Sequence, residues 1–260
     1  MSVAGPTVIV VPCFNEANRL NTQAFLAFAA GHPAVFFLFV NDGSRDRTQD
    51  VLEVLRHANP KQMHLLALER NSGKAEAVRR GFLAAMNMEC GKIGYWDADL
   101  STPLGAIESF EGLFNQETQV SIVMGSRVKL LGRNINRRVV RHYLGRIFAT
   151  WASLILGLPV YDTQCGAKIF RNDGELRAVF AEPFLSRWAF DVEILARYIK
   201  VRQASGGLPV EASTIEYPLE EWTDVSGSKI RFKDYFVLGL DLVRLFIYRR
   251  KPARPGGRFR

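Results

Sequence analysis

Short apolar runs alternate with longer amphipathic stretches along the first 125 residues. The runs are rich in β-branched and aromatic side chains, which favour strands, and the stretches between them have the length and spacing of helices. This alternation predicts an α/β fold in which helices cover a mostly parallel sheet. The expected strands are Val8–Val11, Val35–Val40, His64–Leu68, Ile93–Trp96 and Ser121–Met124. The expected helices are approximately Ala17–Ala30, Arg45–Ala58, Lys74–Glu89 and Pro103–Phe114.

The second expected strand indicates how deeply the sheet is buried. Residues 35–40 read VFFLFV, with no polar position at which one face of the strand could meet water. Such continuous apolar strands are typical of sheets covered on both faces. Ligands of open α/β sheets bind beyond the carboxyl ends of the strands. The polar residues that follow each strand are therefore the candidates for a binding site.

These post-strand segments carry charges of both signs. They read 12-PCFNE-16, 41-NDGSRDRT-48, 71-NSGKAEA-77, 97-DADLSTP-103 and 125-GSR-127. If they gather along one edge of the sheet, that edge suits a ligand with a sugar, a phosphate chain and a divalent metal ion. The side chains expected there are four carboxylates and two cations: Glu16, Asp42, Asp97, Asp99, Lys74 and Arg127.

The strongest single candidate is the pair Asp97 and Asp99, which we expect to bind a metal. Residues at positions i and i+2 at the end of a strand point to the same side. Two carboxylates suit Mg²⁺ or Mn²⁺, which keep coordination positions for phosphate oxygens. An isolated Asp-x-Asp is more typical of a solvated turn, but its place after a buried strand and beside the other four segments favours the metal. Two familiar phosphate motifs are absent, because Ala75 follows Lys74 where a Walker loop has Ser or Thr and no G-x-G-x-x-G follows the first strand.

Composition excludes several classes of protein. The chain has 260 residues, 48% hydrophobic and 23% charged, so it can form one large domain with a substantial core and is not intrinsically disordered. The three cysteines, Cys13, Cys90 and Cys165, are too far apart for a closely spaced zinc motif. Their odd number argues against a full disulfide framework, and we expect a reducing, intracellular compartment. The N-terminus has no basic segment before its apolar run, so no secretory signal is predicted.

The positive charge of the chain is local. The net charge is +8, yet residues 127–146 and 244–260 each contain seven Lys or Arg and no acidic residue, and the remainder is net negative. Local basic patches indicate phosphate-bearing partners such as nucleotides or anionic lipids. Nucleic acid is not the predicted partner, because no motif for it is present and the clustered carboxylates would repel a phosphate backbone.

Residues 138–158 are predicted to form an amphipathic helix with a basic face. This pattern is typical of helices that lie at a membrane surface, although such a face could equally pack against the sheet or a second subunit of a homo-oligomer. A second candidate, residues 235–250, is followed by a basic tail that would be attracted to anionic lipid. The apolar positions of the first helix are Val140, Tyr143, Leu144, Ile147, Phe148, Trp151, Leu154, Ile155 and Leu158.

Seven segments together resemble a known family. Four segments resemble those of the inverting glycosyltransferases of family 2, which have the GT-A fold. These segments are 9-IVVPCFNEANRL-20, 40-VNDGSRDRT-48, 71-NSGKAEAVRRGF-82 and 95-YWDADLSTP-103. Three further segments resemble the dolichyl-phosphate β-glucosyltransferase branch of this family, which is related to dolichyl-phosphate mannose synthase. They are 162-DTQCGAKIF-170, 187-RWAFDVEIL-195 and 222-WTDVSGSKI-230. The resemblance implies a GT-A domain over residues 1–230, which includes the helix at about 138–158. A C-terminal amphipathic helix and basic tail then occupy residues 231–260.

The resemblance implies a role for individual residues. Those that hold the nucleoside are Pro12, Phe14, Glu16 and Asp42, while Asp97 and Asp99 hold Mg²⁺ or Mn²⁺ and the diphosphate. Lys74 lies near the nucleotide, and Lys229 contacts the donor phosphates. Arg127 binds the acceptor phosphate together with a second arginine. The second arginine could be Arg137, Arg138 or Arg141.

The implied reaction is transfer of glucose from UDP-glucose to a polyprenyl or dolichyl phosphate. We expect a cytoplasmic protein that is peripheral at the inner membrane face, with the helix at residues 138–158 as its membrane contact. The open alternatives are GDP-mannose as donor, a soluble alcohol as acceptor, or a non-catalytic module that binds nucleotide sugars or nucleic acid. Asp162 and Asp191 could each serve as a base, bind a sugar hydroxyl or orient an arginine, and Asp191 could instead cap the helix that follows it.

Overall fold

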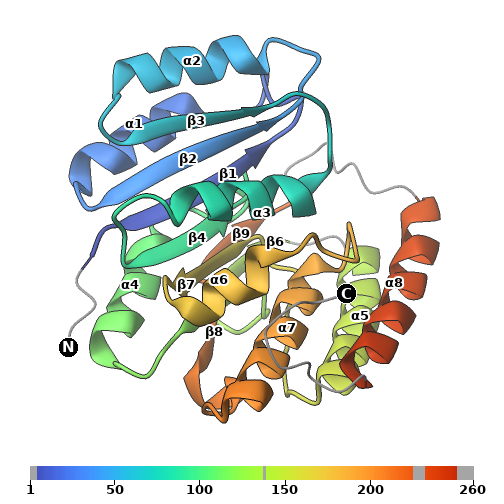
Figure 1. The fold of residues 1–260 in the computed structure, drawn as a ribbon. Helices are drawn as coiled ribbons and strands as arrows, with labels where there is room; N and C mark the ends of the chain where they lie inside the picture. Colours follow the sequence, from blue (N-terminus) through green and yellow to red (C-terminus); the bar gives the residue numbers. More distant parts are fainter. Residues whose placement is uncertain (1–4, 137–138, 225–231, 251–260) are drawn as a thin grey trace.

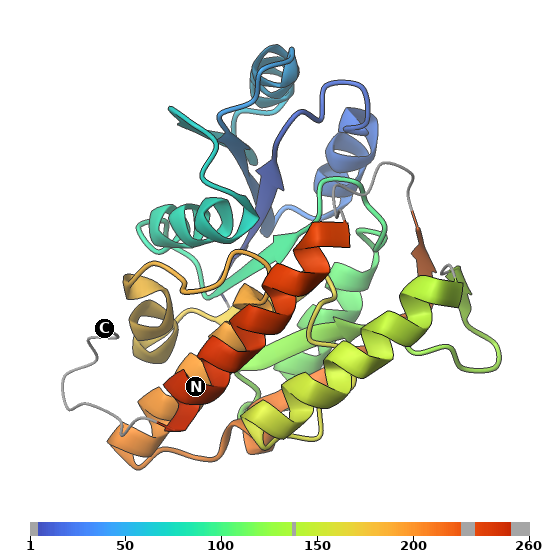
Figure 2. The ribbon, with the colours of Figure 1, turned by 90° about the vertical axis from the view of Figure 1, so that its right-hand side faces the viewer.

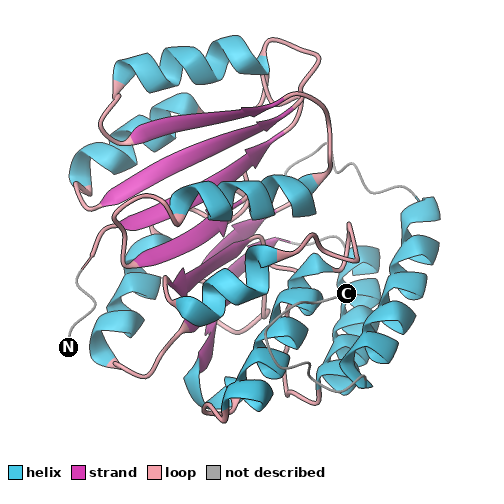
Figure 3. Cartoon of the chain, viewed as in Figure 1, coloured by secondary structure: helices cyan, strands magenta, loops and turns pink. Residues whose placement is uncertain are grey.

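The structure, a computed structural model, describes residues 5–136, 139–224 and 232–250 (Figure 1). Within them, seven strands form one sheet in the order β3-β2-β1-β4-β7-β5-β8 (Figure 3). Strand β7 runs antiparallel to β4 and β5, and the other pairings of this sheet are parallel, so the predicted mostly parallel sheet is confirmed. The strands are β1 (Thr7–Cys13), β2 (Val35–Asp42), β3 (Met63–Leu68), β4 (Lys92–Trp96), β5 (Ile122–Ser126), β7 (Ala167–Arg171) and β8 (Thr214–Pro218).

Alternate side chains of the central strands enter two separate cores. Val10 and Val40 belong to one apolar cluster, whereas Val11 and Phe39 belong to the other, on the opposite face of the sheet. All but one of the residues of β2 are buried. The expectation that this strand is covered on both faces is therefore confirmed.

Helices cover both faces of this sheet (Figure 1). Buried side chains of α1 (Thr22–Gly31), α2 (Thr48–Ala58) and α4 (Ala106–Gln116) join one cluster. Those of α3 (Lys74–Ala85), α6 (Gly174–Ala181) and α7 (Phe190–Ser205) join the other.

The predicted helices exist with shorter bounds. The clearest difference is at α1, because the amides of Arg19 and Leu20 bond to the Glu16 carbonyl in a turn before the helix starts. The side chain of Asn21 then caps α1 by accepting a hydrogen bond from the Ala24 amide.

Two long helices lie outside the helices that cover the sheet. Helices α5 (Val139–Leu156) and α8 (Phe232–Arg250) contact each other and α7 (Figure 2). Leu156 and Leu245 are fully buried between them and the α7 side of the core, so α8 packs on the preceding part of the chain. The 3₁₀ turn η1 (Val210–Ser213) leads into β8, and β6 (Asn134–Asn136) pairs with β9 (Glu221–Thr223) just before α5 begins.

Helix α3 approaches the sheet unusually closely because its inner face carries a glycine. A Cβ atom at Gly81 would lie 2.3 Å from Cγ1 of Val10 and 2.9 Å from Cγ2 of Val40. Real Cβ atoms are not found at such distances, so a larger residue would push the helix away. The close approach matters for the binding site, because Lys74 is the first residue of α3.

We expect Gly81→Ala to destabilise the protein by about 1–3 kcal/mol, because the added methyl group overpacks the contact with Val10. The matched control is Gly112→Ala in α4, where a Cβ atom meets nothing within 4 Å. That variant should be unchanged or stabilised by up to about 1 kcal/mol, the helix preference of alanine over glycine. Urea unfolding of both variants measures the difference, and equal stabilities would contradict the packing argument.

Candidate active site

The loops that follow β1 and β2 are linked into one unit at the carboxyl edge of the sheet. The amide of Asn15 donates to Ser44 Oγ (3.0 Å), and the Asn15 side chain accepts from the amide of Arg45 (2.9 Å). The amide of Glu16 donates to Thr48 Oγ1 (2.8 Å). Asn15 adopts the left-handed conformation at φ 53°, which asparagine tolerates better than most residues. The two loops therefore hold each other in place.

The residues expected at the nucleoside lie along this unit. Pro12 belongs to β1, and Phe14 and Glu16 follow it. Glu16 is buried and accepts two hydrogen bonds from the guanidinium of Arg19, at 2.7 and 2.9 Å. The charge of Asp99 also acts on Arg19, which brings the first and fourth post-strand segments into one electrostatic site.

Asp42, the last residue of β2, binds the turn in front of α3. Its two carboxylate oxygens accept hydrogen bonds from the amides of Ser72 (2.7 Å) and Gly73 (2.8 Å). Burial raises the pKa of Asp42, against the opposing effect of these two amides and of Arg187. The carboxylate therefore fixes the backbone that leads directly to Lys74.

Lys74 and Asp97 form an ion pair at the centre of the site. The Lys74 ammonium lies 2.5 Å from Asp97 Oδ1. Desolvation by itself would lower the pKa of Lys74, but the charges of Asp97 and Asp191 raise it overall, so the lysine stays protonated. Asp97 also lies against Gly166, since a Cβ atom there would be 1.9 Å from Asp97 Oδ2. Position 166 must therefore be glycine if Asp97 is to keep this place.

The residues at this edge fit a divalent metal ion bound together with phosphate. Asp99 uses Oδ1 to accept the amide of Ser101 (3.0 Å), and Leu100 between them takes the left-handed conformation at φ 52°. Asp97 and Asp99 both supply hard oxygen ligands of the kind that Mg²⁺ and Mn²⁺ prefer. In the described part of the chain, no group of three or more His, Cys, Asp and Glu is arranged to hold a metal. An ion held by Asp97 and Asp99 would have further coordination positions open to diphosphate oxygens and water.

Arg127 and Asp162 form a bidentate ion pair beside Cys165. Arg127 Nε and Nη2 donate to Asp162 Oδ2 (2.6 Å) and Oδ1 (2.8 Å), and the Arg127 amide also donates to Oδ2 (3.1 Å). Burial alone would lower the pKa of Arg127, but Asp162 raises it overall. Burial raises the pKa of the Cys165 thiol to about 11, so the thiol is protonated at neutral pH. In the structure, Asp162 orients an arginine.

Asp191 belongs to a buried network behind Lys74. Lys168 Nζ donates to Asp191 Oδ1 (2.7 Å), the Tyr95 hydroxyl (2.7 Å) and the Cys165 carbonyl (2.6 Å). The Tyr95 hydroxyl also donates to Asp191. The suggestion that Asp191 caps the next helix is wrong, because the capping residue of α7 is Ala189 and the Asp191 carboxylate is bound to Lys168.

The remaining predicted site residues divide by position. Arg141 belongs to α5. Arg137, Arg138 and Lys229 lie outside the described residues. Sequence reasoning did not assign roles to three residues that structure the site, although all three lie in the quoted motifs: Gly166, Lys168 and Arg187.

The predicted amphipathic helix divides its apolar face between core and solvent. Phe148 and Ile155 pack against the core cluster. We use "apolar face of α5 and α8" for the exposed apolar side chains of the two helices, among which Trp151 is 58% and Leu154 is 68% exposed. None of the described helices is long and apolar enough to cross a bilayer. The apolar face consists of Tyr143, Ile147, Trp151 and Leu154 from α5, and Leu240, Val243, Phe246 and Ile247 from α8.

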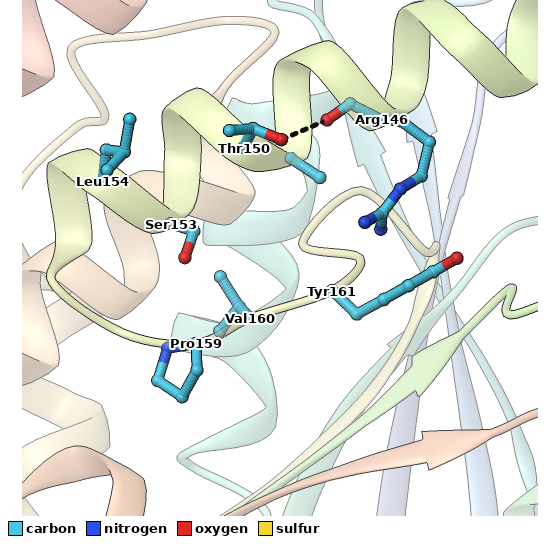
Figure 4. A pocket seen from close by; sticks show the side chains of 8 residues that line it. Arg146, Thr150, Ser153, Leu154, Pro159, Val160 and Tyr161 are labelled. Carbon is cyan, nitrogen blue, oxygen red and sulfur yellow. Dashed lines mark hydrogen bonds between the residues drawn. The ribbon is translucent and has the colours of Figure 1, made fainter.

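A pocket of about 280 Å³ lies between α5 and the loop that follows it (Figure 4). Its α5 wall includes Arg146 and Leu154, and its loop wall includes Val160 and Tyr161. The guanidinium carbon of Arg146 lies 3.8 Å from the centre of the Tyr161 ring. Because Asp162 is the next residue, this pocket adjoins the Arg127–Asp162 pair along the chain.

The chain is similar in sequence to proteins of a known family. Residues 8–175 match the model of the family described as "Glycosyl transferase family 2". A dolichyl-phosphate beta-glucosyltransferase of Mus musculus is 32% identical over 90% of this chain and 73% of its own length. One of Trichomonas vaginalis is 31% identical over 93% of this chain and 71% of its own length.

Solved structures agree on the fold. Glucosyl-3-phosphoglycerate synthase from Mycobacterium tuberculosis, in complex with Mn²⁺, UDP-glucose and phosphoglyceric acid, superposes with a TM-score of 0.65. It is 15% identical, and the match covers 95% of this chain and 80% of that one. The predicted GT-A fold is confirmed, and the chain belongs to glycosyl transferase family 2 and is a glycosyltransferase.

Proposed function

We propose that the protein is a metal-dependent, inverting glycosyltransferase that moves glucose from UDP-glucose to a polyprenyl phosphate at the cytoplasmic face of a membrane. The observation that carries the proposal is the single electrostatic site formed by the Asp97–Asp99 carboxylates, Lys74 and the arginine held by Asp162, in which Asp97 acts on Arg127. The relatives are dolichyl-phosphate beta-glucosyltransferases, which supports a lipid phosphate as acceptor, and the UDP-glucose in the structural neighbour supports the donor.

The donor half of the reaction uses residues at the ends of β1, β2 and β4. Glu16 and Asp42 hold the nucleoside, and Asp97 and Asp99 hold the metal ion against the diphosphate. When bound, the ion neutralises the negative charge that grows on the leaving nucleoside diphosphate. Lys74 keeps Asp97 in position and adds positive charge at the same place.

The acceptor half is a direct displacement. A phosphate oxygen of the acceptor attacks C1 of glucose from the side opposite the UDP. As the new C1–O bond forms, the bond from C1 to the UDP oxygen breaks and its electron pair leaves with UDP, which gives a β-linked product from an α-linked donor. A phosphate monoester already carries a charge of about −1.5 to −2 near neutral pH, so no base has to remove a proton. Arg127 binds and orients this anion.

The apolar face of α5 and α8 supports a membrane location for the acceptor half. Exposed Trp151 and Leu154 lie on the helix whose pocket adjoins Asp162. Apolar side chains together with basic residues are the pattern of helices that rest at a lipid surface. A lipid phosphate can then reach Arg127 while its polyprenyl chain stays in the bilayer.

The decisive assay supplies purified protein with Mn²⁺ or Mg²⁺, UDP-glucose and polyprenyl phosphate, and measures glucose in the organic phase. Asp99→Asn should reduce transfer by about 10²–10³-fold, because one of two metal ligands is lost, and a chelator should abolish it. The matched control is Asp50→Asn on the exposed surface of α2. Hydrolysis of UDP-glucose with no lipid product would contradict the lipid acceptor and favour a soluble alcohol. Transfer from GDP-mannose but not from UDP-glucose would contradict the proposed donor.

Arg127→Lys tests the acceptor role. Lysine keeps the charge but loses the planar fork that pairs with Asp162, so KM for polyprenyl phosphate should rise about 10–100-fold. KM for UDP-glucose should stay unchanged. Arg133→Lys is the control, because Arg133 lies in the same basic segment and pairs with Glu220 at the surface. An equal rise in both KM values would contradict an acceptor-specific role.

Membrane contact is tested by flotation with liposomes that contain anionic lipid. Trp151→Glu should lower the partition coefficient about tenfold or more, since it removes a large apolar group from the lipid contact and adds a like charge to an anionic surface. Val54→Glu is the control, because Val54 is similarly exposed but lies on α2. Equal binding of wild type and both variants would place the membrane contact elsewhere.

A further inference from the structure

Arg187 lies over the turn that joins the nucleoside and diphosphate sides of the site. A Cβ atom at Gly73 would lie 2.8 Å from Arg187 Nη2 and 3.0 Å from Nε, so the guanidinium rests directly on this glycine. The amide of Gly73 is bound to Asp42, and the next residue is Lys74, which pairs with Asp97. Arg187 therefore occupies the space between the residue expected at the nucleoside and the residue expected at the metal.

The charge balance of the site leaves Arg187 available for an anion. Four other cations of the site each have a carboxylate partner: Arg19 with Glu16, Lys74 with Asp97, Arg127 with Asp162, and Lys168 with Asp191. Arg187 makes no hydrogen bond or ion pair with the described residues, and its side chain is exposed, although its charge acts on Asp42. A guanidinium presents two parallel N–H donors that match the geometry of phosphate oxygens.

The backbone on both sides of Arg187 is held firmly. Glu193 accepts hydrogen bonds from the amides of Leu185 and Ser186. Ser186 Oγ accepts from the amide of Ala189 (2.6 Å) and donates to Asp241 of α8 (2.6 Å). These bonds fix the backbone from which the Arg187 side chain extends, so less conformational freedom is lost when its guanidinium binds a ligand.

We propose that Arg187 is a donor-binding residue that contacts the diphosphate of the nucleotide. The inference rests on the proposed function, because it assumes a nucleoside diphosphate as the donor group. In this role the arginine stabilises the negative charge that appears on UDP as the bond to C1 breaks. It thus supplies positive charge from the segment that precedes α7, beside Asp42 and Gly73.

The test compares the binding of UDP with that of uridine, both measured with Mn²⁺ present. Arg187→Ala should weaken UDP binding about 10–100-fold, the range for loss of hydrogen bonds to a charged group, and leave uridine binding unchanged. The UDP affinity of Arg187→Lys should lie between those of the wild type and Arg187→Ala, because lysine keeps the charge but lacks the two parallel N–H donors of the guanidinium. Arg80→Ala, at an exposed position of α3, is the control, and thermal melting checks that each variant is folded.

The outcomes separate this inference from the proposed function. Unchanged UDP affinity in folded Arg187→Ala, or an equal loss for UDP and uridine, would overturn the diphosphate contact. A UDP-specific loss in a protein that transfers no glucose to polyprenyl phosphate would support Arg187 and contradict the proposed acceptor. A wild-type protein that binds no UDP would overturn both.

Discussion

The ion pair between Lys74 and Asp97 is the contact on which the arrangement of the site depends. This ion pair joins the start of α3 to the end of β4. Each of its two residues can take its position only because a glycine leaves room nearby. Gly81 lets α3 pack close to β1 and β2, and Gly166 leaves room for the Asp97 carboxylate. A side chain at either glycine would separate the pair without changing any charged residue. The chemistry of the site is therefore set by close packing as much as by charge.

Around this contact, buried charges are held either by an opposite charge or by backbone amides. Arg127 pairs with Asp162, Lys168 with Asp191, and the amides of residues 161 and 162 are held by Glu216. Buried pairs add little net stability, because the cost of removing two ions from water offsets their attraction. Their value here lies in orientation, since each cation points in one direction and keeps its charge. The proposed recognition of a diphosphate and an acceptor phosphate would need such fixed cations.

The two sides of the site are built from different parts of the fold. The loops after β1 and β2 are hydrogen-bonded to each other, and Asp42 at the end of β2 binds the loop after β3. Arg127 instead follows β5, and Asp162 and the pocket beside Tyr161 follow α5. Helix α8 touches both α5 and, through Asp241 and Ser186, the segment that carries Arg187. The apolar face of α5 and α8 is thereby connected through packed side chains to the segments that we propose bind the two substrates.

The sequence by itself determined the class of fold and the edge at which the chemistry lies. Strand and helix periods are local properties, and residues that follow parallel strands meet at one edge whatever the rest of the chain does. The expected strands and the segments from Glu16 to Arg127 were predictable for that reason. Only the tertiary structure decided which charges pair. The antiparallel strand β7 enters between β4 and β5, and it brings Gly166 and Lys168 beside Asp97 and Tyr95 from about 70 residues away. The partner of Asp191 and the place of Arg187 over Gly73 depend on such long-range packing, which no local pattern of residues encodes.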